Sequence, residues 1–237
     1  MKTDAEFDGV SQIVRHITFA DPDYFWGEGT GFFVLHDQSF YFVTAKHNIL
    51  KEGRLHADSL MVTAYRSRTT IPFDRMLLAD KTGADVDQQD FVIFHVDPVK
   101  ATNLGIDVIH AIQTKGEAML GSEVADGTLL RCAGYPTADD PYDWENRTKS
   151  VHLLVKEGRK NGSALGEGFG TFQGDASLRN FSGMSGSPVF ALVNEAWLWV
   201  GMAVRASGKS GIINYINTDL ILDVLRRDAF FRGVWEV

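Results

Sequence analysis

The feature that most constrains this fold is a series of short runs rich in apolar, β-branched and aromatic residues. The runs are Thr30–Leu35, Phe40–Thr44, Leu60–Tyr65, Phe91–Val96, Thr128–Ala133, Val151–Val155, Pro188–Leu192, Trp197–Val204 and Gly211–Ile216. Most are bounded by Gly, Asp, Asn or Pro, and their lengths suit strands better than helices. The pattern predicts a mostly-β protein.

The segments between these runs predict how the strands are joined. Residues 101–127 show no strand alternation and lie near the middle of the chain, so we expect them to connect two β-units. Residues 136–147 and 156–180 are rich in Gly, Asp, Asn, Ser and charge, and are expected to be surface loops. After the last run, Thr218 or Asn217 could cap a helix that continues to about Arg227.

Composition and charge exclude several classes of protein. The net charge of −8 comes from 31 acidic and 23 basic residues spread along the chain, without the basic stripe that nucleic-acid binding requires. No apolar run approaches the roughly 20 residues needed to cross a bilayer. The acidic amino terminus does not resemble a signal peptide, so we expect a cytoplasmic protein with neither a nucleic acid nor a membrane as partner.

The cysteine and histidine content predicts no metal site and no disulfide. The only cysteine, Cys132, lies in an apolar run and is expected to be a buried core residue. The seven histidines show no His-Glu-x-x-His spacing, and no Cys-x-x-Cys pair is present. We therefore expect no cofactor.

Three local patterns carry residues suited to nucleophilic catalysis. His47 follows a predicted strand, Asp90 opens the strand that begins at Phe91, and Ser185 lies in Gly183-Met184-Ser185-Gly186-Ser187-Pro188. A serine hydroxyl needs an adjacent base, an imidazole can take and return its proton, and a carboxylate can orient the imidazole. Each pattern alone more often indicates a turn or a structural residue, whereas the three together indicate a Ser-His-Asp triad.

These motifs resemble those of the chymotrypsin/trypsin-like serine peptidases, in particular the compact bacterial members related to HtrA-type proteases. The resemblance is carried by Gly29-Thr30-Gly31-Phe32, Thr44-Ala45-Lys46-His47, Asp90-Phe91-Val92-Ile93 and the segment around Ser185. It implies two six-stranded antiparallel β-barrels with the triad between them, followed by the C-terminal helix. The expected domains are residues 1–118, carrying His47 and Asp90, and residues 119–237, carrying Ser185.

The same resemblance implies further site residues. The backbone N–H groups of Gly183 and Ser185 would form the oxyanion hole. The primary substrate pocket would lie near the strand that contains Val204, Arg205 and Ala206, with Gly211 closing it. Arg179 or Arg205 could favour an acidic substrate side chain by charge pairing, and the alternative is that both point to solvent.

The function that these observations predict is a serine endopeptidase acting through an acyl-enzyme on a protein or peptide substrate, with a regulatory protein as a further partner. A role in bacterial stress or antiphage defence follows only from the resemblance and the absence of an export signal. Two alternatives stay open. One is a trypsin-like binding module without catalysis, and the other is an esterase that uses the same triad.

Overall fold

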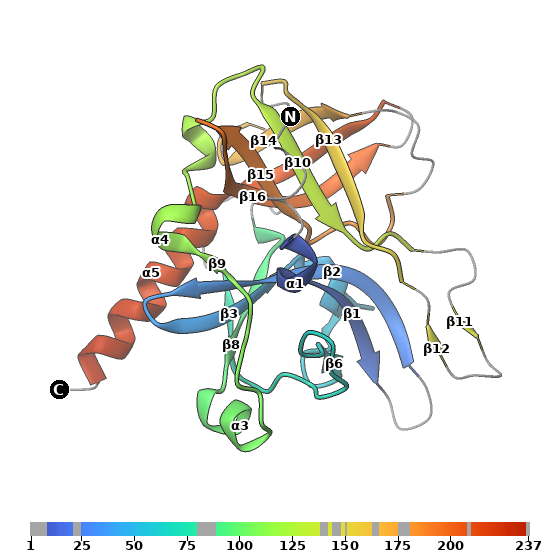
Figure 1. Cartoon of the computed structure of the whole chain (residues 1–237), viewed down its shortest axis with the longest axis vertical. Helices are drawn as coiled ribbons and strands as arrows, with labels where there is room; N and C mark the ends of the chain where they lie inside the picture. Colours follow the sequence, from blue (N-terminus) through green and yellow to red (C-terminus); the bar gives the residue numbers. More distant parts are fainter. Residues whose placement is uncertain are drawn as a thin grey trace.

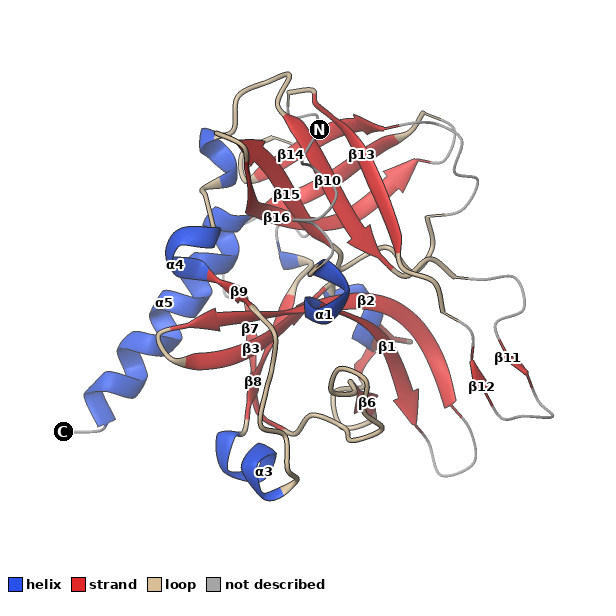
Figure 2. Ribbon diagram, viewed as in Figure 1, coloured by secondary structure: helices blue, strands red, loops and turns tan. Residues whose placement is uncertain are grey.

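The chain folds into two β-units that lie one above the other in Figure 1, with a long helix running along one side of both. The computed structural model describes residues 9–20, 25–79, 89–137, 142–143, 148–149, 151–162, 166–174, 181–207 and 210–235. Strands form most of the body, and the helices lie at its periphery (Figure 2). The predicted mostly-β fold is therefore confirmed.

The first unit is a curled sheet with strand order β6-β1-β2-β3-β8-β7, to which β9 adds on β2. Its elements are α1 (Val10–Ile13), β1 (Val14–Ala20), β2 (Phe25–His36), β3 (Ser39–Thr44), α2 (Lys46–Ile49), β4 (Leu50–Lys51), β5 (Arg54–Leu55), β6 (Leu60–Met61), β7 (Phe73–Leu78) and β8 (Val92–Val96). A six-stranded barrel was expected here. Instead the described part is a curled, open sheet of seven strands, because its edge strands β6 and β7 do not pair with each other and only the isolated bridge between Thr63 and Thr70 joins the residues that link them.

The hairpin β2–β3 brings the first candidate residue to the end of a strand. The register pairs Gly31 with Thr44 and His36 with Ser39, and the turn residues Asp37 and Gln38 both have positive φ. Because α2 begins directly after β3, His47 lies at the carboxyl end of the hairpin.

A connection of short elements links the two units. It consists of α3 (Pro98–Asn103), β9 (Ile112–Gln113), α4 (Thr114–Glu117) and the 3-10 turn η2 (Gly121–Glu123). This agrees with the expected connecting segment 101–127, apart from the helical turn that begins at Pro98. The expected domain boundary between residues 118 and 119 falls within the connection and stays a prediction.

The second unit is a closed six-stranded barrel, β10-β13-β14-β17-β16-β15. Its strands are β10 (Leu129–Gly134), β13 (Leu154–Lys160), β14 (Phe169–Gly174), β15 (Pro188–Val193), β16 (Ala196–Ser207) and β17 (Ile212–Asn217). A short ladder of β11 (Tyr142–Asp143) and β12 (Thr148–Lys149) lies outside the barrel. The predicted second barrel is confirmed.

The expectation that residues 156–180 form a loop was wrong for β13 and β14. In β13 only alternate residues are shielded, yet Lys156 still pairs with Cys132 of β10 and Lys160 with Phe172 of β14. In β14 the small Gly170 leaves room for the ring of Tyr215, since an added Cβ would lie 2.1 Å from that ring. Charged residues in β13 and glycines in β14 interrupt the apolar pattern, so the sequence pattern indicated a loop in this region.

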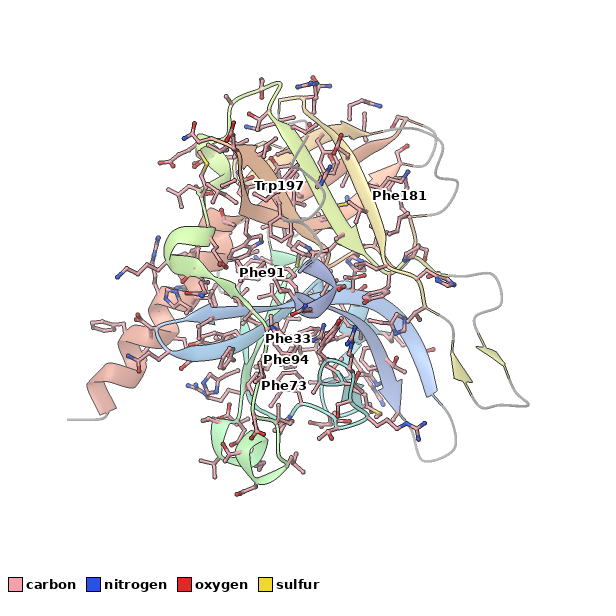
Figure 3. The ribbon with its side chains drawn as sticks, in the orientation of Figure 1. Phe33, Phe73, Phe91, Phe94, Phe181 and Trp197 are labelled. Atoms are coloured by element: carbon pink, nitrogen blue, oxygen red, sulfur yellow. The ribbon has the colours of Figure 1, made fainter. Side chains whose placement is uncertain are left out.

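One hydrophobic core is shared by both units and the C-terminal helix. Phe32 of β2 meets Trp199 of β16 edge to face, with ring centroids 5.5 Å apart, and Leu225 packs in the same cluster. A second cluster lies inside the first sheet, where Figure 3 shows Phe33 and Phe94 close together. The shared core fixes how the two units face each other.

The C-terminal helix α5 (Thr218–Trp235) is longer than the predicted helix, which ended near Arg227. Asp228, near its middle, is buried and accepts hydrogen bonds from Tyr41 Oη at 2.8 Å and from Arg75 Nη1 at 3.1 Å. A helix that begins at the end of the second barrel is thereby fastened to the first sheet.

Candidate active site

His47 and Asp90 form a close pair beside the first sheet. His47 lies in α2, and Asp90 lies directly before the buried Phe91 and strand β8. The distance from His47 Nδ1 to Asp90 Oδ2 is 2.6 Å, and the backbone N–H of His47 donates to Asp90 Oδ1 at 3.0 Å. An ionised carboxylate only accepts hydrogen bonds, so Nδ1 carries the proton and Nε2 keeps a free lone pair.

The histidine is open to solvent whereas its partner is shielded. The side chain of His47 is 46% exposed and that of Asp90 is 17% exposed. The ring therefore has its Nδ1 edge held by the protein while the rest of the side chain can meet a ligand.

Ser185 lies in the segment that leads into β15 of the second barrel. Its Oγ donates a hydrogen bond to the carbonyl of Val204 at 3.0 Å, and no hydrogen bond joins it to His47. A hydroxyl has one proton to donate, so in this arrangement the serine is directed to β16 and not to the imidazole.

Backbone contacts nevertheless place Ser185 next to the histidine. The Ser185 carbonyl accepts from the side-chain amide of Asn48 at 2.8 Å and from the Thr30 N–H at 3.1 Å. Asn48 directly follows His47 in the chain. The structure thus brings the two segments that carry His47 and Ser185 together across the two β-units.

Two peptide groups around Ser185 have their carbonyls tied to the protein and their N–H groups unpaired. The Ser182 carbonyl accepts from Thr137 N–H at 2.7 Å. The Met184 carbonyl accepts from the N–H and hydroxyl of Ser187 at 3.1 and 2.6 Å. In a trans peptide the N–H points away from the carbonyl, so the amides of Gly183 and Ser185 face the other way. Neither amide has a hydrogen-bond partner among the described residues.

The conformation of Gly183 explains why glycine stands at this position. Its φ is +84°, and Met184 N–H donates to the Phe181 carbonyl at 3.0 Å, as in a turn of type II. A Cβ added to Gly183 would lie 2.5 Å from the Tyr135 carbonyl. Both the backbone angle and the close contact exclude a side chain here.

A small hollow opens beside Ser185. It has a volume of about 10 Å³, room for roughly one water molecule. The lining residues are mostly apolar, and they are Cys132, Phe181, Met184, Ser185, Ala203, Val204, Arg205, Ala206 and Ile213. Cys132 is buried, and burial raises the pKa of its thiol to about 12.

The predicted pocket residues have different outcomes. Val204, Arg205 and Ala206 line the hollow. Gly211 does not line it and lies in the turn between β16 and β17, where its N–H donates to the Ser207 carbonyl. Arg179 lies outside the described residues.

Sequence reasoning missed two residues at the contact between the units. Thr30 and Asn48 are both buried and both hydrogen-bond to the Gly183–Ser185 segment. Their signal was present, since Thr30 is a polar residue at the start of an apolar strand and Asn48 is adjacent to the candidate histidine. Only the fold shows what they contact.

Comparison with solved structures identifies the fold. The thermostable serine protease AL20 from an extremophilic microorganism matches with a TM-score of 0.58 at 13% identity, over 87% of this chain and 91% of that one. Protease Anisep from Arthrobacter nicotinovorans matches with a TM-score of 0.59 at 14% identity, over 87% and 90%. The tobacco vein mottling virus protease matches with a TM-score of 0.51 at 12% identity, over 89% and 79%.

The chain therefore has the trypsin-like protease fold, which the sequence motifs had indicated. The more specific relation to HtrA-type proteases stays a prediction. No protein-family model and no curated protein sequence matches the chain. The likeness thus lies in the arrangement of the backbone.

Two further observations concern metal binding and membrane crossing, and both apply to the described residues. No group of three or more His, Cys, Asp or Glu side chains lies together there as a metal site would require. No described helix has both the length and the apolar character that crossing a membrane would take.

Proposed function

We propose that this chain is a serine endopeptidase in which Ser185 is the nucleophile, His47 the general base and Asp90 the residue that orients the imidazole. The observation that carries the proposal is the doubly held Asp90–His47 pair lying next to the Ser185 segment, where two backbone N–H groups have no partner among the described residues. These are the parts that acyl transfer by serine requires.

The first half of the reaction forms the acyl-enzyme. Rotation of the Ser185 side chain moves Oγ from the Val204 carbonyl toward His47 Nε2. Nε2 takes the hydroxyl proton as Oγ bonds to the substrate carbonyl carbon, and the carbonyl electron pair moves to oxygen. The N–H groups of Gly183 and Ser185 stabilise that oxyanion. The carbonyl re-forms as the carbon–nitrogen bond breaks, and Nε2 returns the proton to the leaving amine.

The second half repeats the same proton transfer with water. His47 takes a proton from a water molecule as the water oxygen attacks the acyl carbon. The ester bond to Ser185 Oγ then breaks. The proton on Nε2 goes to the serine oxygen, so the peptide acid leaves and the enzyme is restored. Throughout both halves, Asp90 holds Nδ1–H and stabilises the imidazolium that forms.

The substrate we propose is a polypeptide with a small apolar side chain before the cleaved bond. The hollow next to Ser185 has room for about one water molecule, too little for an aromatic side chain, and is lined mainly by apolar groups. An ammonium group buried there would lose its hydration without a matched partner, because no carboxylate is among the residues that line the hollow. The alternative is an acidic side chain paired with Arg205, whose own side chain is exposed.

Labelling with a fluorophosphonate probe tests the proposal directly. Wild type should be labelled covalently, and Ser185→Ala should not. Ser67→Ala is the control, since this serine is exposed in the first β-unit and its hydroxyl accepts from the Thr69 N–H, away from the Ser185 segment. Cleavage of a diverse peptide library, read by mass spectrometry, then reports peptidase activity and specificity together.

The two alternatives give different results in these assays. A binding module without catalysis would leave the probe unreacted although the protein is folded. An esterase would react with the probe and turn over p-nitrophenyl esters without cleaving any library peptide. Either result would refute the proposed peptidase.

A further inference from the structure

Thr30 connects the first sheet to the turn that carries the unpaired amides. It is fully buried in β2, and its hydroxyl donates to the Gly183 carbonyl at 2.7 Å. The same hydroxyl accepts from the Tyr135 N–H at 2.8 Å. One side chain therefore joins β2, the end of β10 and the turn before Ser185.

These contacts immobilise the peptide group between Gly183 and Met184. Its carbonyl is held by the Thr30 hydroxyl, and its N–H is held by the Phe181 carbonyl at 3.0 Å. A peptide group is planar, so fixing both ends prevents it from rotating. Its plane sets the conformation of Gly183 on one side and of Met184 on the other.

Thr30 also contacts Ser185 through its backbone. Its N–H donates to the Ser185 carbonyl, and its own carbonyl accepts from the Thr44 hydroxyl at 2.7 Å. The Asn48 amide donates to both Thr44 Oγ1 and the Ser185 carbonyl, at 3.1 and 2.8 Å. The resulting network ties the residue next to His47 to both ends of the Gly183–Ser185 segment.

We propose that Thr30 is a positioning residue whose hydroxyl keeps the Gly183 and Ser185 N–H groups aligned with the attacking serine. The inference rests on the proposed function, because alignment has a catalytic meaning only if Ser185 reacts. Thr30 does not touch the substrate. It acts through the turn, so its loss should slow the chemical step more than it weakens binding.

The deciding variant is Thr30→Val, which keeps the shape and removes the hydroxyl. With a fluorophosphonate probe, we expect the maximal labelling rate to fall on the order of 10- to 100-fold while the half-saturating concentration changes little. Thr30→Ser restores the hydroxyl and should recover most of the rate.

Thr171→Val is a matched control for stability. Thr171 is also buried, and its hydroxyl donates to the carbonyls of Asn161 and Gly162, away from the turn. The variant Thr171→Val should lower the melting temperature by about as much as Thr30→Val does, but it should not slow the labelling. Equal labelling rates for Thr30→Val and Thr171→Val would overturn the inference while leaving the proposed function intact.

NMR spectra of the backbone amides distinguish an error in the role proposed for Thr30 from an error in the proposed function. In Thr30→Val the backbone amide signals of Gly183 and Ser185 should shift or broaden, and in Thr171→Val they should not. If wild type is never labelled, the proposed function falls. The amide signals still decide whether Thr30 holds the turn, and unchanged signals in Thr30→Val would refute that role.

Discussion

The carboxylate of Asp90 holds His47 at two points, with Oδ2 on the ring Nδ1 and Oδ1 on the backbone N–H. A single contact would leave the imidazole free to swing, whereas this pair fixes both the position of α2 and the tautomer of the ring. The first prediction follows from this arrangement.

Replacement of Asp90 by asparagine should abolish most of the activity. An amide that donates to Nδ1 stabilises the tautomer with its proton on Nε2, which cannot then act as base. We expect kcat to fall on the order of 10⁴-fold with a small change in KM. Asp97→Asn is the control, because Asp97 caps α3 and should affect stability alone. Steady-state kinetics with both variants would measure this, and a loss under 10-fold in Asp90→Asn would contradict it.

Replacement of Gly183 by alanine should damage the turn and the reaction together. The positive φ strains any side chain, and the Tyr135 carbonyl lies too close for a Cβ. We expect a fall in kcat of about 10² to 10³, the effect of losing one oxyanion donor. Gly127→Ala has a similar φ of +81° with open space around it, so it reports the strain alone. A Gly183→Ala variant as fast as Gly127→Ala would refute the oxyanion role.

Filling the hollow beside Ser185 should change the specificity. Ala206→Val adds two methyl groups to its lining, so cleavage after Ala should decline more than cleavage after Gly. The measurement is kcat/KM for a series of peptides that differ only at this residue. Preferred cleavage after Lys or Arg by wild type would show that this side chain binds elsewhere, and preferred cleavage after Asp or Glu would favour the alternative in which it pairs with Arg205.

Cys132 should be chemically inert in the folded protein. Burial raises the pKa of its thiol from 9.0 to about 12, so almost no thiolate is present at neutral pH. Because the unfolded thiol ionises first, this residue's contribution to stability is retained below about pH 9 and is lost as the pH rises toward 12. Iodoacetamide at pH 8 should modify Cys132 only after denaturant is added, and rapid alkylation of the native protein would contradict this.

Loss of Asp228 should loosen the C-terminal helix. Asp228→Ala would leave the buried Tyr41 hydroxyl without this acceptor and would remove the shorter of two ion pairs made by the partly exposed Arg75. We expect unfolding free energy to fall by about 1 to 3 kcal/mol. Asp223→Ala removes an exposed pair with Arg227 and should cost under about 0.5 kcal/mol. Denaturant titration of both variants compares them, and equal stabilities would refute the anchoring role.

The strand pattern predicted the fold well where one face of a strand is buried and the flanking residues are turn formers. Residues 40–44 and 188–192 fall within β3 and β15. The pattern failed for β7 and β13, whose charged residues interrupt the apolar alternation. Pairing with neighbouring strands stabilises such segments, and pairing is not visible in local sequence.

The candidate site shows the same division. The residues His47, Asp90 and Ser185 could be chosen from their motifs, and the structure brings the first two into direct contact. The rotamer of Ser185, directed to Val204, could not be predicted, because it depends on a strand that follows it in the chain. The position of Thr30 between two units likewise depends on contacts across more than a hundred residues.

By itself the sequence determined the mostly-β character, the helix after Thr218 and the residue types available for chemistry, since these depend on local periodicity and side-chain identity. Only the tertiary structure decided which of them meet. The shared core of Phe32 and Trp199 sets the two units face to face, and the buried polar contacts of Thr30 and Asn48 fix their register there. Such contacts form only when the whole chain has folded, because no local segment contains both partners.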